Sequence, residues 1–452
     1  MLSQQRLQLR LGGLFRSVGV EGVPVVIAEN PTNSPPACTD VRAPQDWGAG
    51  WEMRRAEPRM PLTLPGCPTS TLVSDIHWVF SHLLLGPRIM EMTMPSGTGR
   101  IIPVPQLQPR MTALIKGAGY GSDEPIVVGI QQRDAPPILR AQGLMSSGEP
   151  LTATTLIYAA SLSKQMTAAC AALLAQHGAL DMESALSRWL PQLPAWTDTV
   201  RLRHLVHHTA ALPPDSKIDA TMASDADRTT PSVLRALARF PALDRRPGTE
   251  HVYSNAAYVC LAAAVERAAG QPLPQFAQRQ LFTPLAMVDT CYWRGPDPMP
   301  PGAAPLAFPH PAPLSLGDGG VWTTASDLLR WSQALNADEL GISTLMQTPG
   351  CLDDGTPIDY AWGIGVRSHA GHRVYRHGGG WPGLRAMQAR IPDLDFSVVL
   401  IAVADDTERR ADLLNSLLDE VTKPGIPDSL RGPGSNRRKS NEPFRVMGND
   451  VA

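Results

Sequence analysis

Ser161 and Lys164 combine a hydroxyl and an amine at a spacing that could produce an activated nucleophile. They are the ends of a Ser-Leu-Ser-Lys tetrad that opens a helix predicted over 166–176. Side chains three positions apart share one helix face, so the Ser161 hydroxyl and the Lys164 ammonium can meet. The helix N-terminus would favour an oxyanion at Ser161, and burial would lower the pKa of Lys164 until it accepts a proton. The pattern predicts a serine nucleophile with a lysine base; the alternative is a capping serine beside a surface lysine.

Two further polar motifs follow along the chain. Tyr253-Ser254-Asn255 lies about 90 residues downstream, directly before an apolar helix predicted over 256–269. A second motif, the run from His377 to Gly380, lies about 120 residues further on and leads into a strand predicted over 384–391.

The chain thus carries three motifs in a fixed order: Ser-x-x-Lys, then Tyr-x-Asn, then a basic residue with glycines before a strand. This order resembles that of the serine β-lactamase and penicillin-binding-protein superfamily. More specifically, the pattern looks like the class C-type branch, which includes D,D-peptidases and β-lactamase-like esterases. Three other segments resemble family runs in the same order: LDMESALSRWLP at 180–191, RHLVHHTAAL at 203–212 and GGVWTTASDLLRWSQAL at 319–335. The resemblance covers roughly residues 106–422.

The resemblance implies a role for each matched residue. Ser161 would attack a carbonyl and form an acyl-enzyme. Lys164 and Tyr253 would share the proton transfers, with the pKa of Tyr253 lowered by the neighbouring lysine charge. Asn255 would hydrogen-bond the lysine and the acyl side of the substrate. The backbone N–H groups of Ser161 and Gly380 would form the oxyanion hole.

The third motif departs from the family pattern. His377, which we include among the catalytic residues, stands where lactam-hydrolysing members have the lysine of Lys-Thr-Gly, which helps to hold a substrate carboxylate. Histidine is mostly neutral at pH 7, and the following Gly378 and Gly379 bring no hydroxyl. We therefore expect ester, amide or peptide substrates in preference to β-lactams. The predicted substrate contacts are Gly378, Gly379 and Trp381. Arg385 would supply the missing positive charge if its side chain faces the cleft. The alternative is that the Arg385 side chain faces solvent.

The elements predicted around these motifs place strands at both ends of the domain. Strands are expected over 125–132, 138–142, 372–375, 384–391 and 396–404. Helices are expected at 111–117, through much of 179–300 and over 405–421. This order indicates an antiparallel sheet assembled from both ends with a helical insertion, an α/β (α+β) class. The resemblance implies a β-lactamase/transpeptidase-like fold, in which helices flank the sheet and form a mostly helical subdomain.

Residues 1–105 are rich in proline and show no lasting apolar period. We expect a disordered leader or an over-extended reading frame there, with a small helical subdomain around 72–89 as the alternative. Residues 106–422 would form the hydrolase domain, and 423–452 a disordered tail.

Composition excludes several function classes. Lys and Arg number 40 against 42 Asp and Glu, so the chain lacks the basic excess of a nucleic-acid binder. No apolar stretch is long enough to span a membrane, and no signal peptide is recognised. We therefore expect a cytoplasmic location, with a periplasmic or secreted one as the alternative.

The sequence gives little support for a metal site or for an α/β-hydrolase nucleophile. His204, His207 and His208 could suggest a metal site, but no His-Glu-x-x-His motif accompanies them and the family resemblance accounts for their segment. No Gly-x-Ser-x-Gly elbow is present. The double-displacement mechanism needs no metal or organic cofactor.

The sequence thus predicts a serine hydrolase that cleaves small esters or amides through an acyl-enzyme on Ser161. Within the same class, the alternatives are a D,D-carboxypeptidase, a D-amino-acid peptidase or a weak β-lactamase. From a different class, the alternative is a penicillin-recognising sensor that acylates at Ser161 without turnover.

Overall fold

The computed structural model describes residues 104–422, apart from residue 134 and residues 223–227 and 306–310. The predicted tail and all but the last two residues of the predicted leader lie outside the described residues. Helix α1, Val104–Gly117, begins within those two residues and extends the helix predicted at 111–117 toward the N-terminus. The domain limits themselves stay a prediction.

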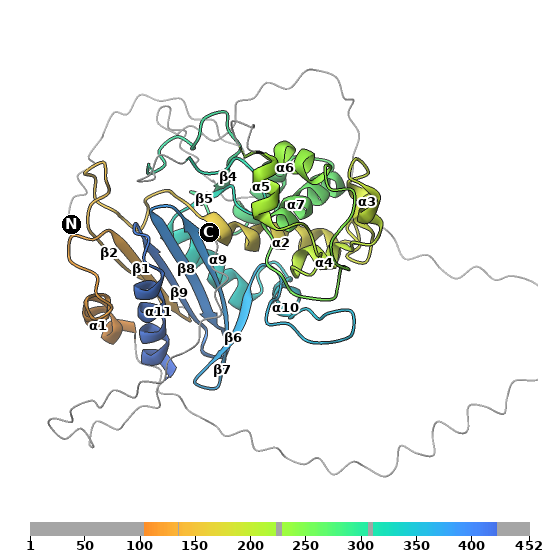
Figure 1. Ribbon diagram of the computed structural model, residues 1–452. Coiled ribbons are helices and arrows are strands. Elements are labelled where there is room, and N and C mark those ends of the chain that lie inside the picture. Colours follow the sequence, from red (N-terminus) through yellow and green to blue (C-terminus); the bar gives the residue numbers. More distant parts are fainter. Residues whose placement is uncertain (1–103, 134, 223–227, 306–310, 423–452) are drawn as a thin grey trace, which may run out of the picture. The chain divides into compact units, whose positions relative to one another are not determined.

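A six-stranded antiparallel sheet joins the two ends of the domain (Figure 1). Its strands, in spatial order, are β2 (Ile138–Gln142), β1 (Ile126–Gln132), β9 (Phe396–Ala402), β8 (Leu384–Ile391), β7 (His372–Trp381) and β6 (Gly365–His369). The first strand, β1, pairs with the last, β9, so that Ile126 lies opposite Ala402. This arrangement confirms the predicted antiparallel sheet built from both ends.

Both faces of the sheet are buried. In β9, Val399 and Ile401 face one apolar core, whereas Val398 and Leu400 face another, as expected for side chains that alternate along a strand. Helices α1 and α11 (Thr407–Thr422) cover the second face, and α9 (Ala325–Ala337) packs on the first (Figure 1).

A mostly helical region follows the first strands, which confirms the predicted helical subdomain. Its helices are α3 (Leu186–Trp189), α4 (Leu202–Val206), α5 (Asp215–Thr221), α6 (Thr230–Leu237), α7 (Asn255–Ala269), α8 (Leu273–Ala277) and α10 (Ser343–Gln347). A small sheet of β3 (Ile157–Tyr158), β5 (Val321–Thr323) and β4 (Cys291–Tyr292) accompanies it.

Helices α2 (Ser163–Gln176) and α7 pack together at the centre of this region. Every α2 residue from Ser163 to Leu174 is buried. From Ala168 onward these residues are alanine, cysteine and leucine, which suits a helix surrounded by core, whereas the first turns carry buried polar side chains. Helix α7 begins where Ser254 Oγ accepts the N–H of Ala257 at 3.2 Å, and it ends at Gly270, whose φ of 63° suits glycine. These two helices carry Lys164 and Asn255, so their packing fixes both.

The sequence predicted several elements closely and missed others. Strands over 138–142 and 384–391 match their predicted limits, but β6 was not foreseen. His377–Gly380 leads into β8 as expected, but these four residues themselves lie inside β7, which extends beyond the strand predicted over 372–375.

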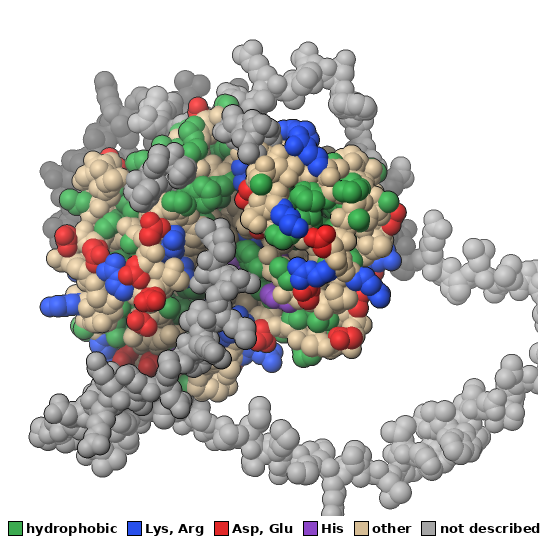
Figure 2. Space-filling view, in the orientation of Figure 1, with side chains coloured by type: hydrophobic (Ala, Val, Ile, Leu, Met, Phe, Trp, Pro, Cys, Tyr) green, Lys and Arg blue, Asp and Glu red, His purple; other side chains and the backbone are tan. Residues whose placement is uncertain are grey.

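Acidic and basic side chains are interspersed over the face shown in Figure 2, in keeping with the nearly balanced composition. No helix in the described part of the chain combines the length and the apolar character that crossing a bilayer requires.

Candidate active site

Ser161 stands in a short 3-10 turn, Ala160–Leu162, directly before α2. Ala160 has a φ of 47°, in the left-handed region that non-glycine residues rarely adopt. Strained residues of this kind concentrate at functional sites, where the surrounding structure holds them. The turn leaves Ser161 partly exposed, whereas Ser163 and Lys164 behind it are buried.

Lys164 lies at the centre of the polar contacts. Its Nζ is 3.3 Å from Ser161 Oγ and donates hydrogen bonds to Asn255 Oδ1 at 2.7 Å and to the Asp318 carbonyl at 2.9 Å. Burial lowers the pKa of Lys164 to about 8, although the charges of Asp318 and Asp215 partly oppose this. A substantial neutral fraction is therefore present near physiological pH, as a proton acceptor requires.

Tyr253 lies beside this lysine, but its acidity differs from the expectation. Its ring centroid is 4.8 Å from Lys164 Nζ. Burial raises the pKa of Tyr253 well above its ordinary value, and a hydrogen bond shared with Ser161 only partly opposes that rise. The predicted lowering of this pKa is wrong, because loss of hydration raises it and the negative charges of Asp318 and Asp215 raise it further. In the free protein Tyr253 is a neutral phenol, suited to donating a proton.

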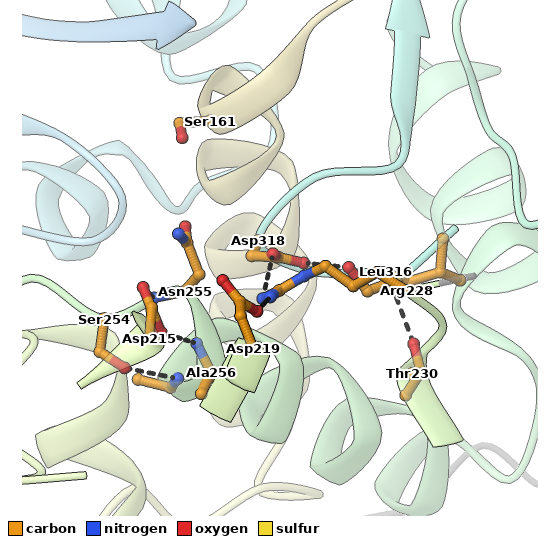
Figure 3. Close-up of polar contacts among 12 residues, drawn as sticks. Ser161, Asp215, Asp219, Arg228, Thr230, Ser254, Asn255, Ala256, Leu316 and Asp318 are labelled. Carbon is orange, nitrogen blue, oxygen red and sulfur yellow. Dashed lines mark hydrogen bonds and ion pairs between the residues drawn. The ribbon is translucent and has the colours of Figure 1, made fainter. Parts of the chain in front are cut away.

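Asn255 is the first residue of α7, and an aspartate from α5 holds that end of the helix. The two carboxylate oxygens of Asp215 accept the N–H groups of Asn255 at 2.9 Å and of Ala256 at 3.3 Å (Figure 3). A carboxylate at a helix N-terminus satisfies free donors and complements the dipole. Asp215 thus positions the amide that contacts Lys164.

The glycines of β7 bring this strand against the nucleophile turn. A Cβ on Gly379 would lie 2.5 Å from the Ala159 carbonyl and 3.3 Å from Leu162, so only glycine fits there. This close approach places Gly380 and Trp381 in the wall of one open pocket of about 310 Å³ together with Ser161 and Asn255. Trp381 also meets Tyr158 edge to face, with ring centroids 6.1 Å apart.

His377 is buried and does not line this pocket. Its Nδ1 is 2.7 Å from the Gly378 carbonyl and so carries the proton, which leaves Nε2 to accept from the Tyr360 hydroxyl at 3.1 Å. Burial and then the charge of Lys164 lower the pKa of His377 to about 4. His377 is therefore a neutral residue that packs near Tyr253, with ring centroids 6.2 Å apart.

Arg385 is committed to other partners and is not a residue of the pocket wall. Its guanidinium pairs with Asp405 at 3.0 Å and donates to the carbonyls of Trp381 at 2.8 Å and Leu384 at 2.9 Å. The suggestion that it faces the cleft as a free positive charge does not agree with this geometry.

Sequence reasoning missed the charged group that forms one wall of the pocket. Asp219, Arg228 and Asp318 line the pocket beside Ser161 and contact one another (Figure 3). Asp318 directly precedes the family-like segment at 319–335, which was a usable signal. Asp219 lies on α5 and Arg228 lies two residues before α6, and no motif indicated them.

The three histidines near residue 206 have separate surroundings. His204 Nε2 lies 3.3 Å from Asp353, His207 packs edge-on against Trp362, and His208 stacks on Tyr253 with centroids 4.3 Å apart. Across the described ranges, no group of three or more His, Cys, Asp or Glu residues has a metal-binding arrangement.

The chain is similar to known proteins in sequence and in fold. The family model described as Beta-lactamase matches residues 130–423. Penicillin-binding protein 4* of Bacillus subtilis is 29% identical over 307 residues, which cover 60% of this chain and 66% of that protein. The D-alanyl-D-alanine-carboxypeptidase/endopeptidase AmpH of Escherichia coli K12 is 25% identical, covering 60% of this chain and 76% of its own.

A solved structure shows the same fold. The D-amino acid amidase of Ochrobactrum anthropi SV3 aligns with a TM-score of 0.59 at 19% identity, covering 69% of this chain and 100% of that one.

Proposed function

Because this chain belongs to the Beta-lactamase family, we propose that it is a serine hydrolase that cleaves small ester or amide substrates through an acyl-enzyme on Ser161. The observation that carries the proposal is the 3.3 Å approach of Lys164 Nζ to Ser161 Oγ at the edge of a pocket. A buried lysine whose pKa is about 8 can take the serine proton, and the pocket admits a small acyl group.

Acylation would begin when neutral Lys164 accepts the proton of Ser161 Oγ, which attacks the substrate carbonyl. The backbone N–H groups of Ser161 and Gly380 are the proposed donors to the oxyanion. Tyr253, a neutral phenol, would give a proton to the leaving group as the tetrahedral intermediate collapses. Water then attacks the acyl-enzyme ester and gives a proton to the Tyr253 phenolate, and the Lys164 ammonium returns a proton to Ser161 Oγ as the acid product leaves.

A D,D-carboxypeptidase or other D-peptidase is the second candidate. The similarity to AmpH, named a D-alanyl-D-alanine-carboxypeptidase/endopeptidase, favours it. Efficient β-lactam hydrolysis is not expected, because neutral His377 replaces a lysine that would hold the carboxylate of a lactam. The predicted cytoplasmic location stays a prediction.

A time course separates an enzyme from a sensor. We expect p-nitrophenyl butyrate to be hydrolysed over many equivalents of p-nitrophenolate per protein molecule. Release that stops at one equivalent would support the penicillin-recognising sensor, and no release of any kind would contradict esterase activity and favour the sensor or a peptide-specific enzyme.

The hydrolytic rate is expected to rise with pH through about 8 and then level off, because neutral Lys164 is the base and burial lowers its pKa to about 8. Burial raises the pKa of Tyr253, so no falling limb from phenol ionisation is expected up to about pH 10. The measurement is kcat/KM against pH, with Ser161→Ala as the correction for spontaneous hydrolysis. A rate that is flat through this range would contradict lysine as the base.

Replacing Asp215 by asparagine is expected to move this rising limb to lower pH. Burial lowers the pKa of Lys164, whereas the negative charges of Asp318 and Asp215 raise it. Removing the charge of Asp215 is therefore expected to lower the pKa of Lys164 further. Ser254→Ala is the matched control, because Ser254 caps the same helix without a charge. The control is expected to lose about 1 kcal/mol of stability without a shift of the limb. Equal pH profiles for Asp215→Asn and the wild type would refute the electrostatic role.

A further inference from the structure

The pocket beside Ser161 has an unbalanced set of charges. Among its described lining residues, the charged side chains are Asp219, Arg228 and Asp318. The two carboxylates, Asp219 and Asp318, line the same pocket as the nucleophile Ser161. A substrate bound at Ser161 must lie in this pocket and so meets their charge.

Arg228 is already engaged by both carboxylates (Figure 3). Its Nη1 contacts Asp219, and its Nη2 lies 3.4 Å from Asp318 Oδ2. Burial alone would lower the pKa of Arg228, but Asp318, Asp219 and Asp215 more than offset this, so its charge persists. One positive charge between two carboxylates leaves this wall with a net negative charge.

The cations that could have held a substrate carboxylate lie elsewhere. His377 is neutral and hydrogen-bonded to Tyr360, and Arg385 is paired with Asp405. Neither residue lines the pocket. Within the described part of the chain, the pocket therefore offers no uncommitted cation to an anionic substrate.

We propose that this pocket selects substrates with a protonated amine near the scissile carbonyl, and that the Asp219 carboxylate binds this ammonium group. The inference rests on the proposed acyl transfer at Ser161 and names its substrate class: amino-acid esters and amides, or the amino-terminal residue of a peptide. An ammonium on the acyl side distinguishes this class from a carboxypeptidase substrate, whose free charge is a carboxylate on the leaving side.

Asp219 is more accessible than Asp318 for this role and has fewer partners. The Asp219 side chain is 54% exposed against 8% for Asp318. Oδ1 of Asp219 accepts a hydrogen bond from Arg228. In the described part of the chain, Oδ2 of Asp219 has no hydrogen-bond partner. Asp318 is committed to Ser315 and Arg228, and its backbone carbonyl accepts from Lys164. A carboxylate–ammonium hydrogen bond is among the stronger recognition contacts.

The test compares alanine methyl ester with methyl isobutyrate, in which a methyl group replaces the ammonium at nearly the same size. Both alanine enantiomers are assayed at pH 7, where the amine is largely protonated. Asp219→Asn is expected to lower kcat/KM for at least one alanine ester by about tenfold more than for methyl isobutyrate. Intrinsic ester reactivity cancels, because each substrate is compared with itself in the two proteins. Asp244→Asn, which changes an exposed carboxylate outside the pocket, is the control and is expected to leave both values unchanged.

An equal loss on both substrates, or no loss on the alanine esters, would overturn the assignment of Asp219. Hydrolysis of p-nitrophenyl butyrate with no hydrolysis of either alanine ester would also overturn it, while leaving the serine hydrolase intact. Failure of the proposed function itself is distinguishable, because the wild type would then hydrolyse none of the esters.

Discussion

Ser161→Ala is expected to lower kcat for p-nitrophenyl butyrate by about 10⁴-fold or more, because the substitution removes the oxygen that forms the acyl-enzyme. The structure supports Ser161 over the other serine of the tetrad. Ser161 lies in the pocket wall next to Lys164 Nζ, whereas Ser163 is fully buried and its Oγ accepts the backbone N–H of Val321 at 3.1 Å.

Ser163→Ala is therefore the matched control. It leaves a buried N–H without its acceptor and is expected to cost about 1–3 kcal/mol of stability. Its kcat is expected to stay within about tenfold of the wild type, since Ser163 does not reach the pocket. Full activity in Ser161→Ala, or an equal loss in both variants, would refute the assignment.

Lys164→Met is expected to reduce kcat by about 10³-fold, the usual contribution of a positioned general base. Methionine fills a similar volume but can neither accept the serine proton nor donate to Asn255 and the Asp318 carbonyl. Removal of a buried charge offsets the loss of these hydrogen bonds, so Tm is expected to change by only a few degrees.

The measurement is kcat together with Tm, and Lys217→Met is the control because Lys217 is an exposed lysine paired with Asp244 at 3.2 Å. A large fall in activity with near-constant Tm separates a chemical role from unfolding. Lys164→Met with normal kcat would contradict lysine as the base.

Local and periodic features were predictable from the sequence. The meeting of Ser161 and Lys164 follows from helical spacing, although Ser161 itself lies in the 3-10 turn before α2. The paired first and last strands followed from apolar runs at both ends of the domain. The convergence of Tyr253 and Asn255 on this pair was predicted from the family resemblance.

Features that depend on burial or on long-range packing were not predictable. The raised pKa of Tyr253 follows from loss of hydration, to which the negative charges of Asp318 and Asp215 add. The positive φ of Ala160 has no sign in the sequence, because alanine rarely adopts this conformation. The Asp219–Arg228–Asp318 group joins residues from three separate segments, and no local pattern brings them together.

Trapping the acyl-enzyme tests the central proposal most directly. Wild-type protein is mixed with p-nitrophenyl butyrate, quenched in acid before the steady state, digested and mapped by mass spectrometry. We predict one butyryl group on the peptide that contains Ser161, present in Ser163→Ala and absent in Ser161→Ala. A butyryl group at another residue, or steady hydrolysis that persists in Ser161→Ala, would contradict the proposed mechanism.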